Sequence, residues 1–328
     1  MKKVLITGGA GFIGYHLANK LIESGYHIDL LDNFSRGVND AQLSDLVENE
    51  KISLINADLL QSAVEQLDHD YRYIYHFAAL IGVQHVLKSP YDVLAKNFTL
   101  LQNALEISRR QKNLERFVFA STSEVYSGTL NQFGLEFPTP ESTPLTVASL
   151  NKARTSYMLS KIYGETMCLH SGLPVTIVRP HNFYGPRMGL SHVIPELMKK
   201  VVDTDTGMFD VFSVKHKRTF CYIADVIDMI QLLAESDKTI GDSYNIGNDD
   251  EEISMGELAQ KIIDLIGKDV AINSMPTTPG SPERRCPSIR KLKKAISYTK
   301  QYPLDKGLQK TFAWYDANVF SGQEVSAI

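Results

Sequence analysis

The chain has 328 residues, which is long enough for one large hydrophobic core or two closely packed domains. Hydrophobic residues make up 43% and charged residues 22%, close to the globular average, which excludes a disordered chain or a coiled coil. The formal net charge is −4, and the basic residues are spread along the sequence. This distribution gives no footprint for binding nucleic acid, so we expect no nucleic-acid partner.

The three cysteines, Cys168, Cys221 and Cys286, lie far apart and are odd in number. This pattern fits neither a disulfide framework nor a zinc site, so we expect no metal and a reducing environment. An apolar run at residues 4–6 ends at once in a glycine-rich stretch, which is too short for a signal peptide. No later stretch approaches the roughly 18 apolar residues that a membrane span requires. These features predict a cytoplasmic protein with no membrane segment.

Short apolar runs alternate with helical patterns through the first half of the chain. The helical patterns include residues 12–24 and 91–110. Near-continuous apolar strands separated by helices predict an α/β fold, a Rossmann-like, doubly wound parallel sheet covered on both faces. The expected buried strands are residues 4–7, 28–31, 52–55, 73–77, 117–120 and 175–179.

The alternation breaks down after Pro180, and the second half predicts a smaller C-terminal α/β lobe. Ser254 and Glu257 have the spacing of a capping box, which predicts that a helix begins there. A proline-rich loop at residues 276–282 follows it. The other expected elements are a helix near residues 193–202, a strand near 218–222 and a helix near 225–235.

A glycine-rich turn, Gly8-Gly9-Ala10-Gly11-Phe12-Ile13-Gly14, follows the first strand and opens the first helix. One glycine allows a sharp turn, another lets the backbone approach a pyrophosphate, and a third lets the helix pack on the strand. The second strand ends in Asp32, at the distance where a carboxylate receives the ribose hydroxyls of an adenosine. The pattern predicts NAD, because Asp32 would repel the 2′-phosphate of NADP. Arg36 leaves an alternative open, since a nearby arginine can accommodate that phosphate.

These patterns divide the chain into two parts. Residues 1–178 form the expected NAD-binding domain, and residues 223–248 return to it. Residues 179–328 form mainly the lobe that binds the substrate.

Tyr157 and Lys161 lie four residues apart, so on a helix they share one face. A free tyrosine titrates near a pKa of about 10, which is too high for a base at neutral pH. A lysine ammonium and the positive charge of an oxidised nicotinamide both favour the phenolate. Such a pair is common on exposed helices, so it indicates proton transfer only together with the other motifs of the chain.

Three features occur in one order along the chain: the glycine turn, the hydroxyl cluster Ser121-Thr122-Ser123 after the fifth strand, and the pair of Tyr157 and Lys161. In this order the sequence resembles the extended short-chain dehydrogenase/reductase family, the nucleotide-sugar epimerases and dehydratases. The resemblance runs from Val4 to about Tyr315. It implies an NAD-dependent enzyme acting on a nucleotide-diphosphate sugar, and a homodimer joined through the helices that carry Asn97 and Tyr157.

Matches beyond the glycine turn extend the cofactor site. Asp58-Leu59 resembles the adenine contact of the family, and His76-Phe77-Ala78-Ala79 resembles its strand lining the cofactor. The cofactor-binding residues that the resemblance implies are Gly8, Gly11, Phe12, Ile13, Gly14, Asp32, Asn33, Asp58, Leu59, Phe77, Ala78, Ala79, Asn97, Tyr157 and Lys161.

Two further motifs resemble the substrate side of the family. Residues 179–187, Arg-Pro-His-Asn-Phe-Tyr-Gly-Pro-Arg, are similar to its signature, in which an asparagine contacts the diphosphate. Residues 218–225 resemble the motif whose arginine holds the diphosphate, and Arg285 falls where the family has a second phosphate arginine. A planar guanidinium suits such oxygens because it donates two parallel hydrogen bonds. The implied substrate-binding residues are Ser123, Asn182, Arg187, Arg218 and Arg285.

The resemblance also implies the first chemical step. Tyr157, assisted by Lys161, takes the proton of the sugar 4-hydroxyl, Thr122 hydrogen-bonds the same oxygen, and the C4 hydride passes to the nicotinamide. The resulting 4-keto sugar is open to epimerisation, 4,6-dehydration, decarboxylation or release. Glu124 follows Thr122 by two residues, so both side chains can face the cleft, and it is the candidate for a step after oxidation.

Residues 122–126, Thr-Ser-Glu-Val-Tyr, bear on the outcome of the reaction. One type of 4,6-dehydratase has an aspartate in place of Ser123, and another usually prefers NADP. UDP-glucuronate decarboxylases share Thr-Ser-Glu-Val-Tyr and have an arginine motif similar to that of Arg285. We expect an epimerase because that activity is common in the family, with decarboxylase, 4,6-dehydratase and net 4-dehydrogenase as alternatives. An inactive NAD-binding sensor is the alternative of another class.

Overall fold

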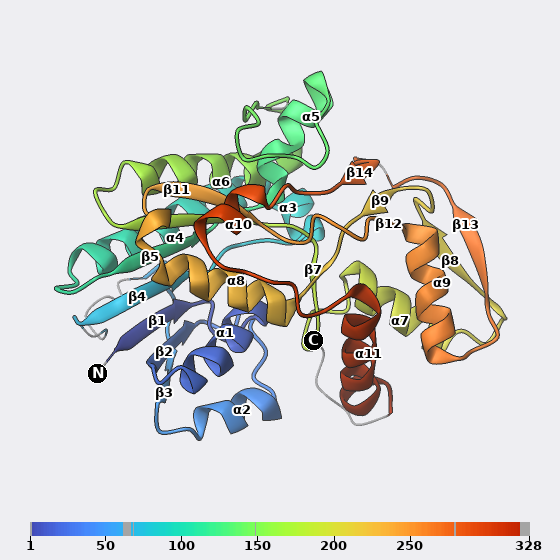
Figure 1. The fold of residues 1–328 in the computed structure, drawn as a ribbon, viewed down its shortest axis with the longest axis horizontal. Helices are drawn as coiled ribbons and strands as arrows, with labels where there is room; N and C mark the ends of the chain where they lie inside the picture. Colours follow the sequence, from blue (N-terminus) through green and yellow to red (C-terminus); the bar gives the residue numbers. More distant parts are fainter. Residues whose placement is uncertain (1, 62–66, 68, 148, 279, 322–328) are drawn as a thin grey trace.

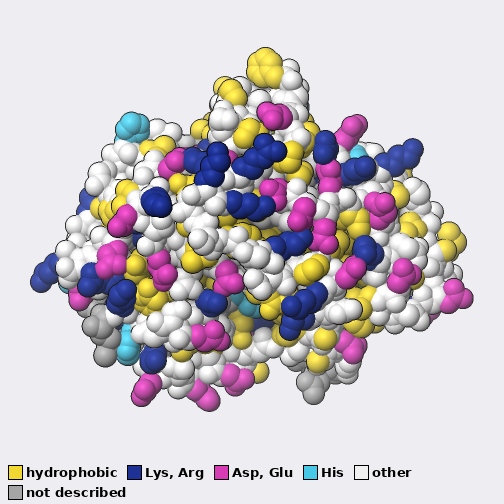
Figure 2. All heavy atoms as spheres, in the orientation of Figure 1, with side chains coloured by type: hydrophobic (Ala, Val, Ile, Leu, Met, Phe, Trp, Pro, Cys, Tyr) yellow, Lys and Arg dark blue, Asp and Glu magenta, His cyan; other side chains and the backbone are white. Residues whose placement is uncertain are grey.

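The computed structural model of the protein describes residues 2–61, 67, 69–147, 149–278 and 280–321. Pro279 of the predicted proline-rich loop, and residues 1 and 322–328 at the ends of the predicted domains, lie outside the described residues. Figure 1 shows a large sheet covered by helices beside a smaller lobe. On the face shown in Figure 2, Lys and Arg side chains are interspersed with Asp and Glu side chains.

The main sheet has seven strands, each parallel to its neighbours, in the order β11-β6-β5-β4-β1-β2-β3. The predicted Rossmann-like, doubly wound α/β fold is therefore confirmed. All six strands expected for this sheet belong to it, and β11 is an additional edge strand. The strands are β1 Lys3–Thr7, β2 His27–Asp32, β3 Ile52–Asn56, β4 Tyr71–His76, β5 Arg116–Ala120, β6 Val175–Pro180 and β11 Asp242–Ile246.

Successive residues of each strand face opposite sides of the sheet, and each side packs against its own helices. On β1, Val4 and Ile6 belong to the core under α1 and α8, whereas Leu5 belongs to the core under α4 and α6. Because both faces are covered, the strands read as continuous apolar runs in the sequence. The helices of this part are α1 Phe12–Glu23, α2 Ala41–Val47, α3 Val83–Lys88, α4 Pro90–Arg109, α5 Ser127–Phe133, α6 Ala153–Leu169 and α8 Ile223–Glu235.

A smaller α/β lobe, as predicted, is built from the second half of the chain (Figure 1). The predicted capping box is present: the Ser254 side chain accepts a hydrogen bond from the Glu257 amide, and the Glu257 carboxylate accepts one from the Ser254 amide. The helices after residue 180 other than α8 are α7 Val193–Asp203, α9 Met255–Ile266, α10 Arg290–Ala295 and α11 Leu304–Tyr315. The strands are β7 Phe183–Tyr184, β8 Met208–Phe212, β9 Lys217–Arg218, β10 Cys221–Tyr222, β12 Ile253–Ser254, β13 Ala271–Met275 and β14 Arg284–Arg285.

The expectation of one strand near residues 218–222 is wrong. The chain forms two short strands, β9 and β10, that belong to different sheets. The Thr219 amide bonds the carbonyl of Arg285 on β14, but the Cys221 amide bonds the carbonyl of Asn182. The hydrogen-bond partner therefore changes between these two residues, and a single strand cannot continue through them.

Within the described part of the chain, no helix combines the length and apolar character needed to cross a membrane. Among the same residues, His, Cys, Asp and Glu side chains form no group that could hold a metal ion. The cysteines are buried free thiols.

Candidate active site

The glycine turn leaves an open, positively polarised helix end next to β1. Gly8 has φ +73°, and a Cβ there would lie 2.8 Å from the backbone nitrogen of Ala78. A Cβ on Gly14 would lie 2.5 Å from the carbonyl oxygen of Gly8, so neither position admits a side chain. Helix α1 begins after Gly11 with no side-chain cap and no acidic residue in its first turn. Its free amides and dipole suit the pyrophosphate of a dinucleotide, so these residues fit NAD.

Asp32, at the end of β2, fixes the turn from both sides. Its carboxylate accepts hydrogen bonds from the amides of Ala10, at 3.0 Å, and Phe34, at 2.9 Å. Burial raises the pKa of Asp32, and these backbone hydrogen bonds oppose that effect. Asn33 is exposed, and its side chain accepts a hydrogen bond from the Ser35 amide. The carboxylate thus already orders the loop in which the adenosine ribose is predicted to bind.

In this fold a dinucleotide binds in the crevice at the carboxyl ends of the strands, which is called the groove below. The residues that follow β4 lie on its other side from Asp32. Phe77, Ala78 and Ala79 are partly buried there. The Asn97 side chain accepts a hydrogen bond from the Leu80 amide at 2.7 Å and donates to the Leu80 carbonyl at 3.1 Å. Asn97 therefore shapes the wall through Leu80. Of the other predicted contacts, Phe12 and Ile13 are partly buried on α1, Leu59 is buried, and the Asp58 carboxylate caps the Leu60 amide.

Tyr157 and Lys161 lie one turn apart on α6 and contact the residues at the end of β5. Burial raises the pKa of Tyr157 to about 12, while a hydrogen bond with Thr122 and the charge of Arg36 lower it. The ammonium of Lys161 donates to the carbonyl of Ala120 at 2.7 Å, and burial lowers its pKa to about 8. The charge of Arg36 therefore favours the Tyr157 phenolate, and the role of Lys161 toward Tyr157 stays a prediction.

Glu124 lies in the one-turn helix η2 (Ser123–Tyr126) and is held by two arginines. Its carboxylate forms ion pairs with Arg285, at 2.6 Å, and with Arg154, at 3.4 Å. Burial alone would raise the pKa of Glu124, but Arg285 and Arg154 outweigh it and the pKa is lowered. Glu124 therefore carries its negative charge at neutral pH.

Arg218 and Arg285 lie side by side because β9 and β14 pair in parallel, with these two residues in register. The Arg218 guanidinium donates to Ser281 at 3.1 Å and to the Pro282 carbonyl. Burial and the charge of Arg285 lower the pKa of Arg218 to about 10, so it stays charged at neutral pH. Two adjacent cations of this kind suit a diphosphate.

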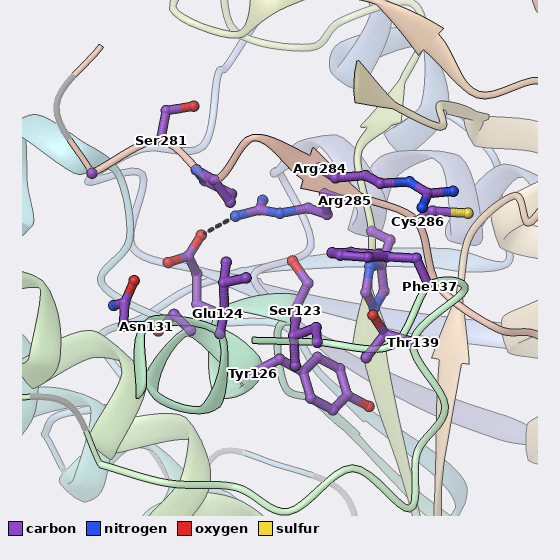
Figure 3. A pocket seen from close by; sticks show the side chains of 16 residues that line it. Ser123, Glu124, Tyr126, Asn131, Phe137, Thr139, Ser281, Arg284, Arg285 and Cys286 are labelled. Atoms are coloured by element: carbon purple, nitrogen blue, oxygen red, sulfur yellow. Dashed lines mark hydrogen bonds and ion pairs between the residues drawn. The ribbon is translucent and has the colours of Figure 1, made fainter. Parts of the chain in front are cut away.

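A pocket opens beside Glu124 and Arg285 (Figure 3). Figure 3 shows the carboxylate and the guanidinium reaching toward one another from η2 and β14. Ser123 lies on the same wall and is buried. The remaining lining residues are Tyr126, Ser127, Leu130, Asn131, Leu135, Phe137, Thr139, His181, Gly280, Ser281, Pro282, Arg284 and Cys286.

Two predicted substrate residues have other partners. Arg187 is buried, pairs with Asp40 at 2.8 Å and lies over the Tyr15 ring, so it joins the small lobe to the loop before α2. The side-chain amide of Asn182 donates a hydrogen bond to the Thr219 carbonyl at 2.9 Å and supports the break between β9 and β10.

Arg154 is a further residue of the site that no sequence motif had indicated. It precedes Tyr157 by three residues, which places both on one face of α6, and this spacing was the available signal. Besides Glu124, Arg154 bonds the Gly280 carbonyl at 3.4 Å, which ties the proline-rich loop to the site.

Comparison with models of protein families shows the family to which the chain belongs. The model of the NAD dependent epimerase/dehydratase family matches residues 4–247, so the protein belongs to that family. The predicted family, the NAD cofactor and the assignment as an enzyme are confirmed.

Individual relatives carry more specific names. The chain is 32% identical to UDP-N-acetyl-alpha-D-glucosaminuronate decarboxylase of Bacillus cytotoxicus, over 96% of the chain and 98% of that protein. It is 30% identical to UDP-glucuronic acid decarboxylase 1 of Arabidopsis thaliana, over 98% of the chain and 72% of that protein. Among solved structures, UDP-glucuronic acid 4-epimerase from Bacillus cereus, with UDP-glucuronic acid and NAD, matches with a TM-score of 0.81 at 26% identity, over 96% of the chain and 99% of that structure.

Proposed function

We propose that the protein is a decarboxylase of a UDP-linked uronic acid. One observation carries this proposal: Glu124 and Arg285, which stem from two motifs that resemble the decarboxylases, meet at 2.6 Å on the wall of one pocket. The relatives from Bacillus cytotoxicus and Arabidopsis thaliana, aligned over nearly the whole chain, are decarboxylases of UDP-uronic acids. The proposal replaces epimerisation, which the sequence alone favoured, as the first choice.

The chemistry follows from the residues at the end of β5. NAD, when bound, supplies the hydride acceptor for oxidation at C4 of the sugar. Tyr157, in its phenolate form, accepts the proton of the 4-hydroxyl, and Thr122, which is already hydrogen-bonded to Tyr157, orients the same oxygen. The 4-keto sugar with a C6 carboxylate is a β-keto acid. Its C5–C6 bond breaks, CO₂ leaves, and the electron pair stays as an enolate that takes a proton at C5. The C4 ketone then takes back the hydride and the proton held by Tyr157, so the reaction as a whole is redox-neutral.

The adjacent arginines Arg285 and Arg218 can bind anionic groups of such a substrate. Arg285 and Arg218 lie adjacent, and we propose that they receive the diphosphate, with Asn182 shaping the strand that carries Arg218. Glu124 pairs with Arg285 on the pocket wall and with Arg154 on α6, and we propose that it acts after oxidation, at C5 or at the C6 carboxylate. Residues 1–178 together with 223–248 would bind the cofactor, and the rest of the chain mainly the nucleotide sugar.

Glu124→Gln tests this division of labour. The variant keeps the shape of the side chain but loses the charge that pairs with both arginines. We expect substrate to reduce bound NAD at a normal rate, while release of CO₂ falls by about 10²–10⁴-fold. Glu115→Gln is the matched control, because Glu115 also pairs with an arginine, Arg72, and does not line the pocket. Normal CO₂ release by Glu124→Gln would leave Glu124 with only a structural role.

Epimerisation of the same substrate class is the second candidate. It is favoured by the likeness to the UDP-glucuronic acid 4-epimerase of Bacillus cereus, at 26% identity. In that reaction the carboxylate stays on the sugar and the 4-keto intermediate is reduced from its other face. Ser123, which stands where one dehydratase type has an acidic aspartate, weighs against 4,6-dehydration.

We further propose a homodimer formed through α4 and α6. Tyr91, Leu94 and Phe98 follow one another at helical spacing on α4 and are exposed by 81%, 39% and 37%. Phe98 contacts the ring of Tyr163 on α6, which is 52% exposed, so the two helices present one apolar surface. A second copy that buried this surface would remove four large side chains from water.

A further inference from the structure

Arg36 crosses the groove of the cofactor. Its guanidinium donates a hydrogen bond of 3.1 Å to the carbonyl of Ile81. Arg36 follows β2 and Ile81 follows β4, and in the sheet β1 lies between these two parallel strands. The bridge from Arg36 to Ile81 therefore passes over the glycine turn after β1, at residues 8–11, where a dinucleotide pyrophosphate binds in this fold.

Both ends of the bridge are fixed. Ile81 follows Leu80, which is bound at its amide and its carbonyl by Asn97, and Asn97 also donates to Ser160 on α6 at 3.2 Å. The first hydrogen bond of α3 goes to the carbonyl of Gly82, which leaves the Ile81 carbonyl for Arg36. On the other side, the Asp32 carboxylate holds the amide of Phe34.

The guanidinium lies where the two halves of the molecule meet. Burial raises the pKa of Tyr157, and the charge of Arg36 lowers it, so the cation is within electrostatic reach of α6. Burial and the same charge lower the pKa of His192, which precedes α7 in the small lobe. Arg36 itself is exposed, so the bridge lies at the surface of the molecule.

We propose that Arg36 acts as a clasp that closes the groove over bound NAD and slows passage of the cofactor in both directions. A guanidinium engaged with Ile81 holds the groove shut without contacting the cofactor. The alternative raised by the sequence, that Arg36 receives a 2′-phosphate, assigns it to recognition instead. The inference rests on NAD binding and is independent of the sugar reaction proposed above.

Stopped-flow binding of NADH, followed by displacement with excess NAD, tests the clasp without any nucleotide sugar. For Arg36→Ala we expect entry and release of NADH each to accelerate by about tenfold, the lower range for loss of a hydrogen bond to a charged group. Because both rates rise together, the Kd should stay nearly constant. Arg110→Ala is the control, since Arg110 is an exposed arginine that precedes the amino end of β5, whereas Arg36 follows the carboxyl end of β2.

Two results would overturn the clasp. Faster release with unchanged entry would show that Arg36 contacts the cofactor, as would a larger loss of affinity for NADPH than for NADH. Unchanged rates in both directions would show that the bond to Ile81 does not restrict the groove. Because Arg36 is exposed, its replacement leaves the core intact, and thermal unfolding of the variant should match that of Arg110→Ala.

Discussion

The buried ammonium of Lys161 should destabilise the folded protein. We therefore expect Lys161→Met to increase the free energy of unfolding. Burial lowers the pKa of Lys161 from 10.5 to about 8, an effect that Glu165 partly opposes. At about 1.4 kcal/mol per pKa unit, keeping the ammonium charged in the folded state below pH 8 costs about 3 kcal/mol. Methionine removes this cost. The Ala120 carbonyl then loses its hydrogen bond, which destabilises the variant by about 1 kcal/mol. We therefore expect the variant to be more stable by about 2 kcal/mol at pH 7.

The direction of the pKa shift also determines how the stability difference changes with pH. Since the pKa of Lys161 is lower in the folded chain than in the unfolded chain, the unfolded chain binds the additional proton between pH 8 and 10.5. The stability of the wild type relative to the variant should therefore rise with pH across this window. Unfolding by urea and by heat, measured on cofactor-free protein at pH 7 and pH 10, provides the comparison. A variant that is less stable than the wild type at pH 7 would refute the reasoning.

The remaining predictions concern turnover, binding and assembly. Tyr157→Phe should fold and bind NAD while turnover falls by at least about 10²-fold, the usual effect of losing an acid–base group; near-normal turnover would contradict its role. Arg218→Ala and Arg285→Ala should each weaken binding of the nucleotide sugar by about tenfold or more in calorimetry without changing NAD affinity, and an unchanged sugar affinity in both would remove them from the site. Light scattering should give the mass of a dimer, and Tyr91→Asp on α4 should shift it toward the monomer; a monomeric wild type would contradict the proposed interface.

The fold was largely predictable because local patterns determine it. Strands buried on both faces are continuous apolar runs, and the glycine turn after β1 combines several constraints in seven residues. Strand β11 was harder to recognise, because Asp242 and Ser243 open it with polar residues at the sheet edge. The break between β9 and β10 involves a hydrogen bond from Asn182, which is distant in sequence, so no local pattern predicts it.

The sequence identified most residues of the site but not the contacts between them. The motifs identified Glu124 and Arg285 separately, but only the folded chain shows that they pair across 161 positions. Arg36 could be interpreted only as a neighbour of Asp32, because its partner Ile81 lies on a different loop. Contacts of this kind depend on which loops meet at one edge of the sheet, which the spacing of residues does not reveal.

The central claim concerns the fate of C6 of the sugar. The most direct measurement is to incubate the NAD-loaded enzyme with UDP-glucuronate and UDP-N-acetylglucosaminuronate that carry ¹³C at C6, and to follow the label by mass spectrometry. We expect labelled CO₂ and a UDP-linked product that has lost the carboxylate. A UDP-uronic acid that is inverted at C4 and retains the label would contradict decarboxylation and identify the enzyme as an epimerase.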